Sequence, residues 1–194
     1  MDTTKIEAAV RLMLEAFGED PDRDGLKDTP RRVAGYWVEM LRGAKYTNEQ
    51  IANMFGKRFT VPACPLVVKR CENVFSHCEH HLALMYNMTV SVAYIPAKTE
   101  DGYQVIGLSK IPRIVDMCAK RLQLQEKLAE DIAECISIAT GSDDIYVNIV
   151  ADHACVSARG AKNSGVTDVT SLRGRFIADD ALRSEVERKL APRM

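Results

Sequence analysis

The order of secondary-structure patterns after about Pro65 is the feature that most limits the fold of this 194-residue chain. Two segments rich in β-branched residues come first, a long helical stretch follows, and two extended segments come next. Strand pairs before and after a pair of helices favour an antiparallel sheet with helices on one face. We therefore predict an α+β fold. Because a small open sheet exposes its edges and one apolar face, we expect oligomerisation to cover them.

The individual elements follow from the same patterns. The two strands before the helical stretch are predicted at 66–70 and 88–95, with a further short strand candidate at 104–108. A strand after it is predicted at 145–152. Ser109 can cap a helical stretch that runs to about 139, breaks near 121–123 and stops at Gly141.

The region before Pro65 has a helical pattern instead. Apolar residues between Ile6 and Phe17 recur on one helical stripe, and Thr29-Pro30 is an N-cap followed by proline at the first helical position. These patterns predict helices over 4–17 and about 30–42. The sequence therefore divides into an N-terminal helical extension, residues 1–58, and a second domain, residues 59–194.

Composition narrows the function classes. A net charge of −1 gives no general attraction to nucleic acids or membranes, and no apolar run is long enough to span a bilayer. We also expect no secretory leader, because the N-terminus lacks a charged segment followed by an apolar one. Six cysteines outside the setting of a small secreted domain indicate a reducing compartment, so we expect a cytoplasmic protein.

Two short clusters of histidine and cysteine indicate a metal site. Three of the four histidines fall within residues 77–81, around Cys78, and the fourth, His153, lies two positions before Cys155. Cys78 and His81 are three apart and would face the same way on a tight helical turn. His153 and Cys155 would project together from an extended segment. Two thiolates with one or two imidazoles form a ligand set that suits zinc.

The spacing leaves the type of metal site open. A catalytic zinc keeps three protein ligands, which would leave His80 and His153 free to move protons, whereas a structural zinc is closed by four. Without a metal, Cys155 would be a buried apolar side chain and the histidines a solvated turn. The spacing favours the metal. The other cysteines are interpreted as structural: Cys64, Cys71, Cys118 and Cys135.

Several longer motifs match one known family in the same order along the chain. They are TPRRVA at 29–34, SHCEHHL at 76–82, VAYIP at 92–96, VIGLSKIPR at 105–113, QLQEKL at 123–128 and HACVSARG at 153–160. On these motifs the chain resembles GTP cyclohydrolase I from about Thr29 to Phe176. The resemblance implies a T-fold (tunnelling fold), an antiparallel sheet with two helices on one face, preceded by an N-terminal helical segment. It also implies a toroidal homodecamer of two pentamers with active sites at subunit interfaces.

The resemblance also implies a reaction. GTP and water give 7,8-dihydroneopterin triphosphate and formate, which is the first step of pterin and tetrahydrofolate biosynthesis. Zinc held by Cys78, His81 and Cys155 would activate water for attack on C8 of guanine, because a bound metal lowers the pKa of water toward neutrality.

Roles in proton transfer and base recognition follow from the resemblance as well. His80 would protonate the imidazole nitrogen during ring opening, and His153 and Ser109 would assist opening and rearrangement of the ribose. Glu126 is the candidate for guanine, since a carboxylate accepts two parallel hydrogen bonds from N1–H and the 2-amino group. Gln125 is expected in the same pocket.

The triphosphate requires local positive charge. Lys110 and Arg113 are three apart at a predicted helix start, where free backbone N–H groups also favour phosphate. Arg159 follows the second cluster. The resemblance adds Arg32, donated by a neighbouring subunit.

Three departures from the family pattern leave alternatives. Gly35 stands where the family often has lysine, residues 83–87 replace a proline-phenylalanine and glycine pattern, and Asp168 stands where serine or threonine is common. A negative charge facing the ligand would be unfavourable. The alternatives are a diverged T-fold zinc enzyme acting on another purine nucleotide, and a non-catalytic zinc-binding assembly protein. The interpretation that the motifs favour is an active GTP cyclohydrolase I.

Overall fold

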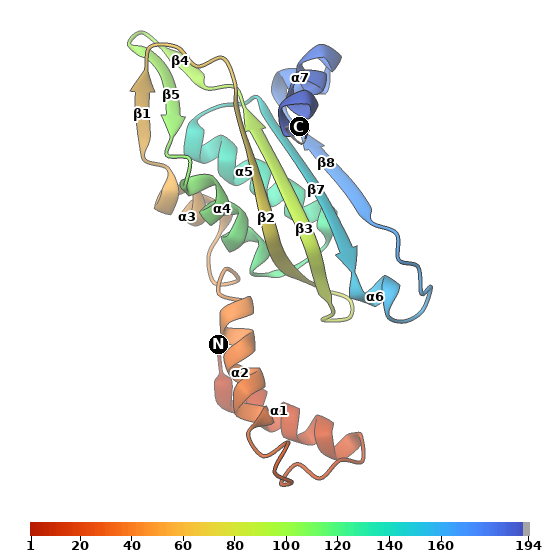
Figure 1. Cartoon of the computed structure of the whole chain (residues 1–194). Coiled ribbons are helices and arrows are strands. Elements are labelled where there is room, and N and C mark those ends of the chain that lie inside the picture. Colours follow the sequence, from red (N-terminus) through yellow and green to blue (C-terminus); the bar gives the residue numbers. More distant parts are fainter. Residues whose placement is uncertain (192–194) are drawn as a thin grey trace. The chain divides into compact units, whose positions relative to one another are not determined.

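The computed structural model describes residues 1–191, which form two compact units, residues 1–42 and a unit that begins at Gly43 (Figure 1). In the first unit, α1 (Thr3–Ala16) packs against α2 (Thr29–Met40), so both predicted helices are confirmed. Asp2 caps α1 by accepting a hydrogen bond from the Lys5 N–H at 3.0 Å. No helix among the described residues combines the length and apolar character needed to cross a bilayer.

The larger sheet lies in the second unit and, within residues 43–191, has the strand order β6-β2-β3-β7-β8 (Figure 1). Its four longer strands are antiparallel, as predicted, and the short β6 runs parallel to the end of β2. The central strands are longer than the sequence pattern indicated and reach the turn that joins them. The bounds are β2 Val67–Cys78, β3 Leu84–Tyr94, β6 Leu122–Gln123, β7 Ile145–His153 and β8 Thr167–Leu172.

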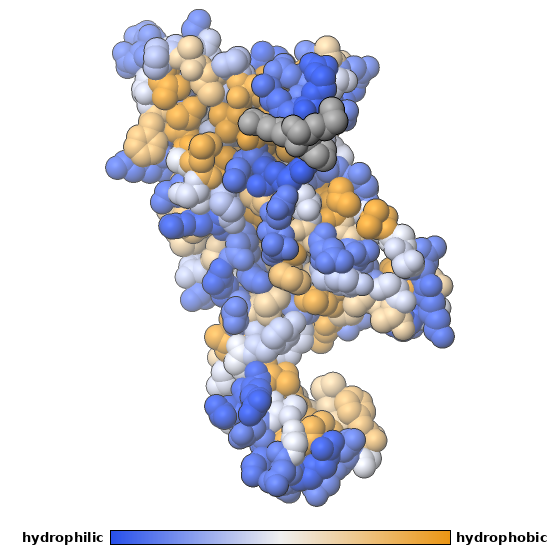
Figure 2. Space-filling model, in the orientation of Figure 1, coloured by the Kyte–Doolittle hydropathy of each residue, from blue (hydrophilic) through white to orange (hydrophobic). Residues whose placement is uncertain are grey.

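A smaller sheet consists of β1 (Arg58–Val61), β5 (Gly102–Ile106) and β4 (Ala97–Thr99). β5 corresponds to the strand predicted at 104–108. Figure 2 shows apolar surface gathered over this sheet, where the side chain of Phe59 is exposed. Apolar surface of this kind is typical of contact sites.

The helices α3 (Asn48–Phe55), α4 (Lys110–Ala119) and α5 (Gln125–Thr140) pack together, and α4 and α5 cover one face of the larger sheet. Two helices on one face is the arrangement predicted from the sequence and implied by the T-fold resemblance. The sequence patterns did not lead us to predict α3. Because α3 belongs to the unit that begins at Gly43, the packing divides the chain earlier than position 58, and the division into domains 1–58 and 59–194 stays a prediction.

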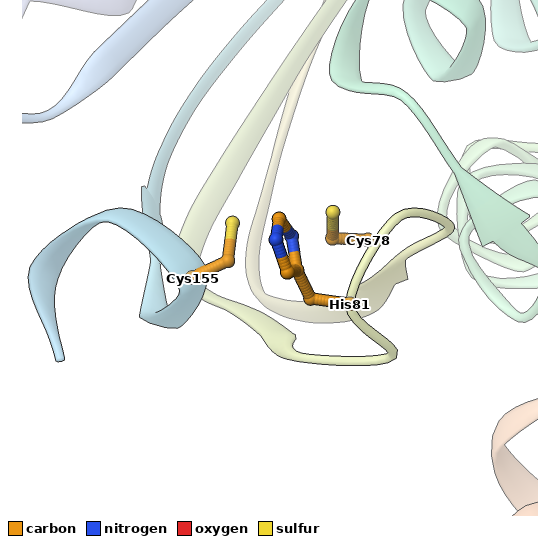
Figure 3. Close-up of side chains that lie close together, drawn as sticks. All are labelled: Cys78, His81 and Cys155. Atoms are coloured by element: carbon orange, nitrogen blue, oxygen red, sulfur yellow. The ribbon is translucent and has the colours of Figure 1, made fainter. Parts of the chain in front are cut away.

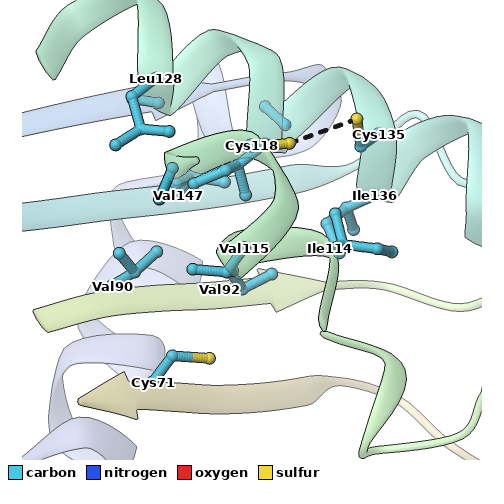
Figure 4. Close-up of a cluster of buried hydrophobic side chains, with 14 of the residues drawn as sticks. Cys71, Val90, Val92, Ile114, Val115, Cys118, Leu128, Cys135, Ile136 and Val147 are labelled. Atoms are coloured by element: carbon cyan, nitrogen blue, oxygen red, sulfur yellow. Dashed lines mark hydrogen bonds between the residues drawn. The ribbon is translucent and has the colours of Figure 1, made fainter. Parts of the chain in front are cut away.

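Alternation along the strands explains how this core forms (Figure 4). Val90 and Val92 of β3 point toward α4 and α5, whereas Ala93 points to the opposite face. Cys118 of α4 and Cys135 of α5 are fully buried in the same layer, with their Sγ atoms 3.6 Å apart. They pack as apolar side chains, which agrees with their interpretation as structural cysteines.

The opposite face of the sheet is partly covered by the C-terminal segment, which the sequence analysis did not assign. A 3-10 turn (Gly174–Ile177) and helix α7 (Asp180–Leu190) follow β8. Phe176 and Val186 pack there against Tyr146 and Ala93. Next to this cluster the same face carries polar side chains, among them Ser91, Asn148, Asp168 and Thr170. The expected bare apolar face is therefore wrong for this side of the sheet.

A buried polar network fixes the loop between α4 and α5. Asp131 accepts hydrogen bonds from Arg121 Nη1 at 3.1 Å, Gln123 Nε2 at 2.9 Å, Lys127 Nζ at 2.6 Å and Asn48 Nδ2 at 3.0 Å. Gln123 lies in β6 and pairs with Cys78, so the network holds the strand that lies beside the turn after β2.

Replacing Asp131 by asparagine is expected to lower the free energy of unfolding by about 3 kcal/mol, because it leaves the partly buried Arg121 without its counter-charge. The measurement is urea unfolding, with Glu134→Gln as a control. Glu134 is an exposed partner of Asn48, so its variant is expected to lose less than about 1 kcal/mol. Equal losses in the two variants would contradict the prediction.

The same network has a pH dependence. Burial raises the pKa of Asp131, but hydrogen bonds from Lys127, Gln123 and Asn48 lower it by more, so the net shift is downward. The stabilisation is therefore complete above about pH 4, the unfolded-state pKa, and is lost as the pH falls through the lower folded-state pKa.

Candidate active site

The turn between β2 and β3 brings two of the predicted metal ligands together. Cys78 is the last residue of β2, and its N–H and C=O bond to Ala83 O and Leu82 N, both at 2.9 Å. The chain closes through Leu82 in a left-handed conformation with φ of 52°. A non-glycine residue in this conformation is uncommon and is often found at functional sites. Cys78 and His81 thus lie on one tight turn, as the sequence predicted.

The second cluster differs from the prediction. Strand β7 ends at His153, and Cys155 lies in the short helix α6 (Ala154–Ser157) instead of continuing the strand. Ser157 Oγ donates to His153 O at 3.0 Å, and Ala158 N donates to Ala154 O at 3.0 Å, which bends the backbone into a helical turn. His153 and Cys155 therefore do not project together from an extended segment.

The change of direction at α6 places Cys155 against the β2–β3 turn. Figure 3 shows the side chains of Cys78, His81 and Cys155 directed toward one another, and their potential ligand atoms all lie within 4.8 Å of each other. Zinc bonds of about 2.3 Å to sulfur and 2.0 Å to nitrogen separate tetrahedral ligand atoms by roughly 3.5–3.8 Å. Shifts of about 1 Å would close the group around an ion, so two thiols and one imidazole fit zinc.

The electrostatics of this group involve Arg159. Burial raises the pKa of the Cys155 thiol, and so does the neighbouring Cys78, while the positive charge of Arg159 acts in the opposite direction. Arg159 Nη1 also donates a hydrogen bond to His81 Nε2 at 3.0 Å. Because a coordinated thiol is deprotonated outright, a bound metal would override the upward shift at Cys155.

His153 lies beside the start of α5. Its Nε2 is 2.6 Å from Oε1 of Gln125, the first residue of that helix. Burial lowers the pKa of His153, and the negative charges of Glu126 and Asp152 act in the opposite direction. Gln125 is 2% exposed and Glu126 is exposed, so the two neighbours face different surroundings.

The remaining histidine of the turn, His80, is exposed. Its ring lies edge-on to that of His81, with centroids 6.4 Å apart and an interplanar angle of 86°. It is therefore adjacent to the ligand group and accessible.

Comparisons with known proteins agree with this geometry. The family model for GTP cyclohydrolase I matches residues 6–191. The chain belongs to the GTP cyclohydrolase I family. It is 49% identical over 188 residues to GTP cyclohydrolase 1 of Clostridium acetobutylicum, and this match covers 94% of both chains. It is 46% identical over 193 residues to GTP cyclohydrolase 1 of Clostridium botulinum, covering 96% of both.

Among solved structures, the chain is similar to an archaeosine synthase QueF-like protein at a TM-score of 0.44 and 22% identity. This match covers 58% of this chain and 96% of the other.

Not all residues expected from the GTP cyclohydrolase I family lie at this site within one chain. Ser109 and Lys110 begin α4 soon after β5, and Ile106 at the end of β5 donates its N–H to Tyr94 Oη at 3.3 Å. Tyr94 pairs with Val67, the first residue of β2, whereas the ligand turn follows the last. The helix start that carries Ser109, Lys110 and Arg113 thus lies toward the other end of the sheet.

Two further positions bear on the family pattern. Arg32 lies in α2 of the first unit, exposed, with its Nη2 3.7 Å from Asp28 Oδ2. Gly35 in the same helix has open space where a Cβ would stand, so a side chain at that position would fit.

Asp168 bonds to Asn148 on the polar face of the sheet, which is the face away from Gln125 and α5. Its charge therefore does not face the ligand group of its own chain.

Proposed function

We propose that this chain is an active GTP cyclohydrolase I, which converts GTP and water into 7,8-dihydroneopterin triphosphate and formate. The family membership supports the reaction, and the gathering of Cys78, His81 and Cys155 is the observation that carries the proposal. These three residues would hold zinc, which supplies the Lewis acidity that lowers the pKa of water for attack at C8 of guanine. Unpaired cysteines support a reducing, cytoplasmic location.

A three-ligand site supports a catalytic metal over a structural one. His153 bonds to Gln125 instead of joining the ligand group. His80 is exposed and adjacent, which suits a group that exchanges protons with a substrate. We assign His80 to protonation of the purine imidazole nitrogen, and His153 to opening and rearrangement of the ribose.

Base recognition is assigned to Glu126. It lies in the first turn of α5, close enough to His153 for its charge to affect the pKa of that ring. A carboxylate there can accept both hydrogen bonds from the N1–H and 2-amino group of guanine, whereas adenine lacks this pair of donors.

The triphosphate site is assigned to residues from more than one copy of the chain. Arg159 lies at the ligand group, but Lys110 and Arg113 lie toward the other end of the sheet in the same chain, and so does Ser109, which is assigned with His153 to the ribose steps. A neighbouring copy can supply them, and Arg32 as well. This arrangement supports the expected homodecamer, with active sites at its interfaces and the exposed apolar surface of the small sheet as one contact.

The test is incubation of the zinc-loaded protein with GTP, following formate release and pteridine fluorescence after oxidation, with a chelator-treated control. Both products, formed only with metal, are expected. Formate without pteridine would favour the diverged T-fold enzyme. The absence of both products would contradict the proposed function.

A His80→Ala variant separates a catalytic zinc from a structural one. Zinc content is expected to stay at the wild-type value while kcat falls on the order of 10²–10⁴-fold, because the variant loses a proton-transfer group but keeps all three zinc ligands. The measurements are metal analysis of the purified variant and steady-state kinetics. Loss of zinc would instead assign His80 as a fourth ligand and support the non-catalytic alternative.

A further inference from the structure

The side chain of Gln125 is held by three partners from two strands. Its Nε2 lies 2.8 Å from the carbonyl oxygen of Ile149 in β7 and 3.1 Å from that of Thr167 in β8. Its Oε1 lies 2.6 Å from His153 Nε2. At 2% exposure the side chain is closed off from solvent.

These contacts fix the orientation of the amide. Both carbonyl oxygens can only accept, so they require the two hydrogens of the NH₂ group on their side. A flipped amide would direct Oε1 at two acceptors and NH₂ at the histidine, leaving buried groups unpaired at a cost of about 1–3 kcal/mol each. Oε1 therefore faces His153.

The orientation of the amide in turn fixes the proton on the ring. An amide oxygen only accepts, so Nε2 of His153 must carry a hydrogen in this contact. In the neutral ring the lone pair then resides on Nδ1. Three chain segments, α5, β7 and β8, set this tautomer together.

We propose that Gln125 is a positioning residue that fixes His153 as the Nε2–H tautomer, so that Nδ1 is the ring atom that exchanges a proton with the substrate. The inference rests on the proposed function for the role of His153, but the tautomer itself does not depend on turnover. This arrangement also changes the expected role of Gln125. Because both hydrogens and the oxygen of its side-chain amide are engaged inside the chain, the Gln125 side chain does not read guanine, and this task is left to Glu126.

The tautomer is measured directly by magic-angle-spinning NMR of protein labelled with ¹³C,¹⁵N-histidine, which works for assemblies of any size. Carbon–nitrogen correlations distinguish Nδ1 from Nε2, and a His153→Gln sample identifies the signals of this residue among the four histidines. The hydrogen is expected on Nε2 in the wild-type protein. A hydrogen on Nδ1 of neutral His153 would overturn the proposal without any variant of Gln125.

Two variants test the role of Gln125. Gln125→Leu is expected to convert His153 to a tautomer mixture and to lower kcat on the order of 10²-fold, with zinc content and the KM for GTP unchanged. In Gln125→Glu the buried carboxyl is expected to stay protonated and to donate its O–H to one of the two carbonyl oxygens, with its other oxygen facing Nε2. This variant is therefore expected to keep the Nε2–H tautomer and retain more activity. Gln50→Leu, in the capping box of α3, is the control for loss of an amide.

The outcomes separate the two proposals. An unchanged tautomer in Gln125→Leu, or a changed tautomer with unchanged kcat, would refute the positioning role. If Gln125→Leu does not fold, the wild-type spectrum and Gln125→Glu decide. A wild-type protein without cyclohydrolase activity but with the Nε2–H tautomer would refute the proposed function and leave the assignment of the tautomer standing.

Discussion

Replacing Cys155 by alanine is expected to remove zinc binding and cyclohydrolase turnover together. Four-ligand zinc sites bind with about 10–16 kcal/mol, or roughly 3–4 kcal/mol per ligand, so losing one ligand weakens zinc binding on the order of 10²–10³-fold. Cys155 and Cys78 supply the two thiols of the group, and both come from backbone turns that hold them in place. Cys78→Ala is therefore expected to behave in the same way.

The measurement combines zinc affinity, by competition with a chromophoric chelator, with the formate and pteridine assay. Cys64→Ala is the matched control, because Cys64 is a half-buried thiol outside the ligand group. It is expected to keep both zinc and activity. Normal turnover in a zinc-free Cys155→Ala protein would refute the metal mechanism.

The second large effect is expected at Glu126. Glu126→Gln keeps the size of the side chain but offers guanine one acceptor where the carboxylate offers two. Sites that lose a hydrogen-bonding match of this kind discriminate less by factors of about 10⁴. The kcat/KM for GTP is therefore expected to fall by roughly 10³–10⁵-fold, with zinc retained.

Inosine triphosphate, which lacks the 2-amino group, provides the specific readout. The wild-type preference for GTP over inosine triphosphate is expected to disappear in Glu126→Gln. Glu130→Gln is the control on the same helix, since Glu130 bonds to Ser171 and Arg173 instead. A variant at Glu126 that keeps the wild-type preference would assign base recognition to another group.

The two N-terminal helices, the central strands of the larger sheet and the two helices that cover it could be predicted because they depend on local patterns. The break in the helical stretch near 121–123 and the left-handed Gly141 after α5 were visible as changes of period and as a C-cap residue. Helix α7 could also have been found, since Leu182, Val186 and Leu190 recur at helical spacing, and all three pack on the second core.

The site was only partly predictable because its geometry depends on contacts distant in sequence. The sequence Ala-Cys-Val-Ser contains no signal that β7 ends and a helical turn begins there. That turn sets the direction of the Cys155 side chain. The side chain of Gln125 bonds to residues 24 and 42 positions away in the sequence. Its orientation therefore could not be inferred from neighbouring residues such as Glu126. Local spacing identified the metal-ligand candidates, but it could not show where the other site residues lie in the folded chain.

The distance between the ligand turn and the start of α4 has a genetic consequence under the proposed shared site. In the proposed assembly, each polypeptide would contribute the zinc half of one active site and the phosphate half of another. A chain damaged in one half still carries an intact other half, so two inactive chains with different lesions can complement each other within one mixed assembly. For the same reason, a single defective copy lowers the output of sites built with its healthy neighbours.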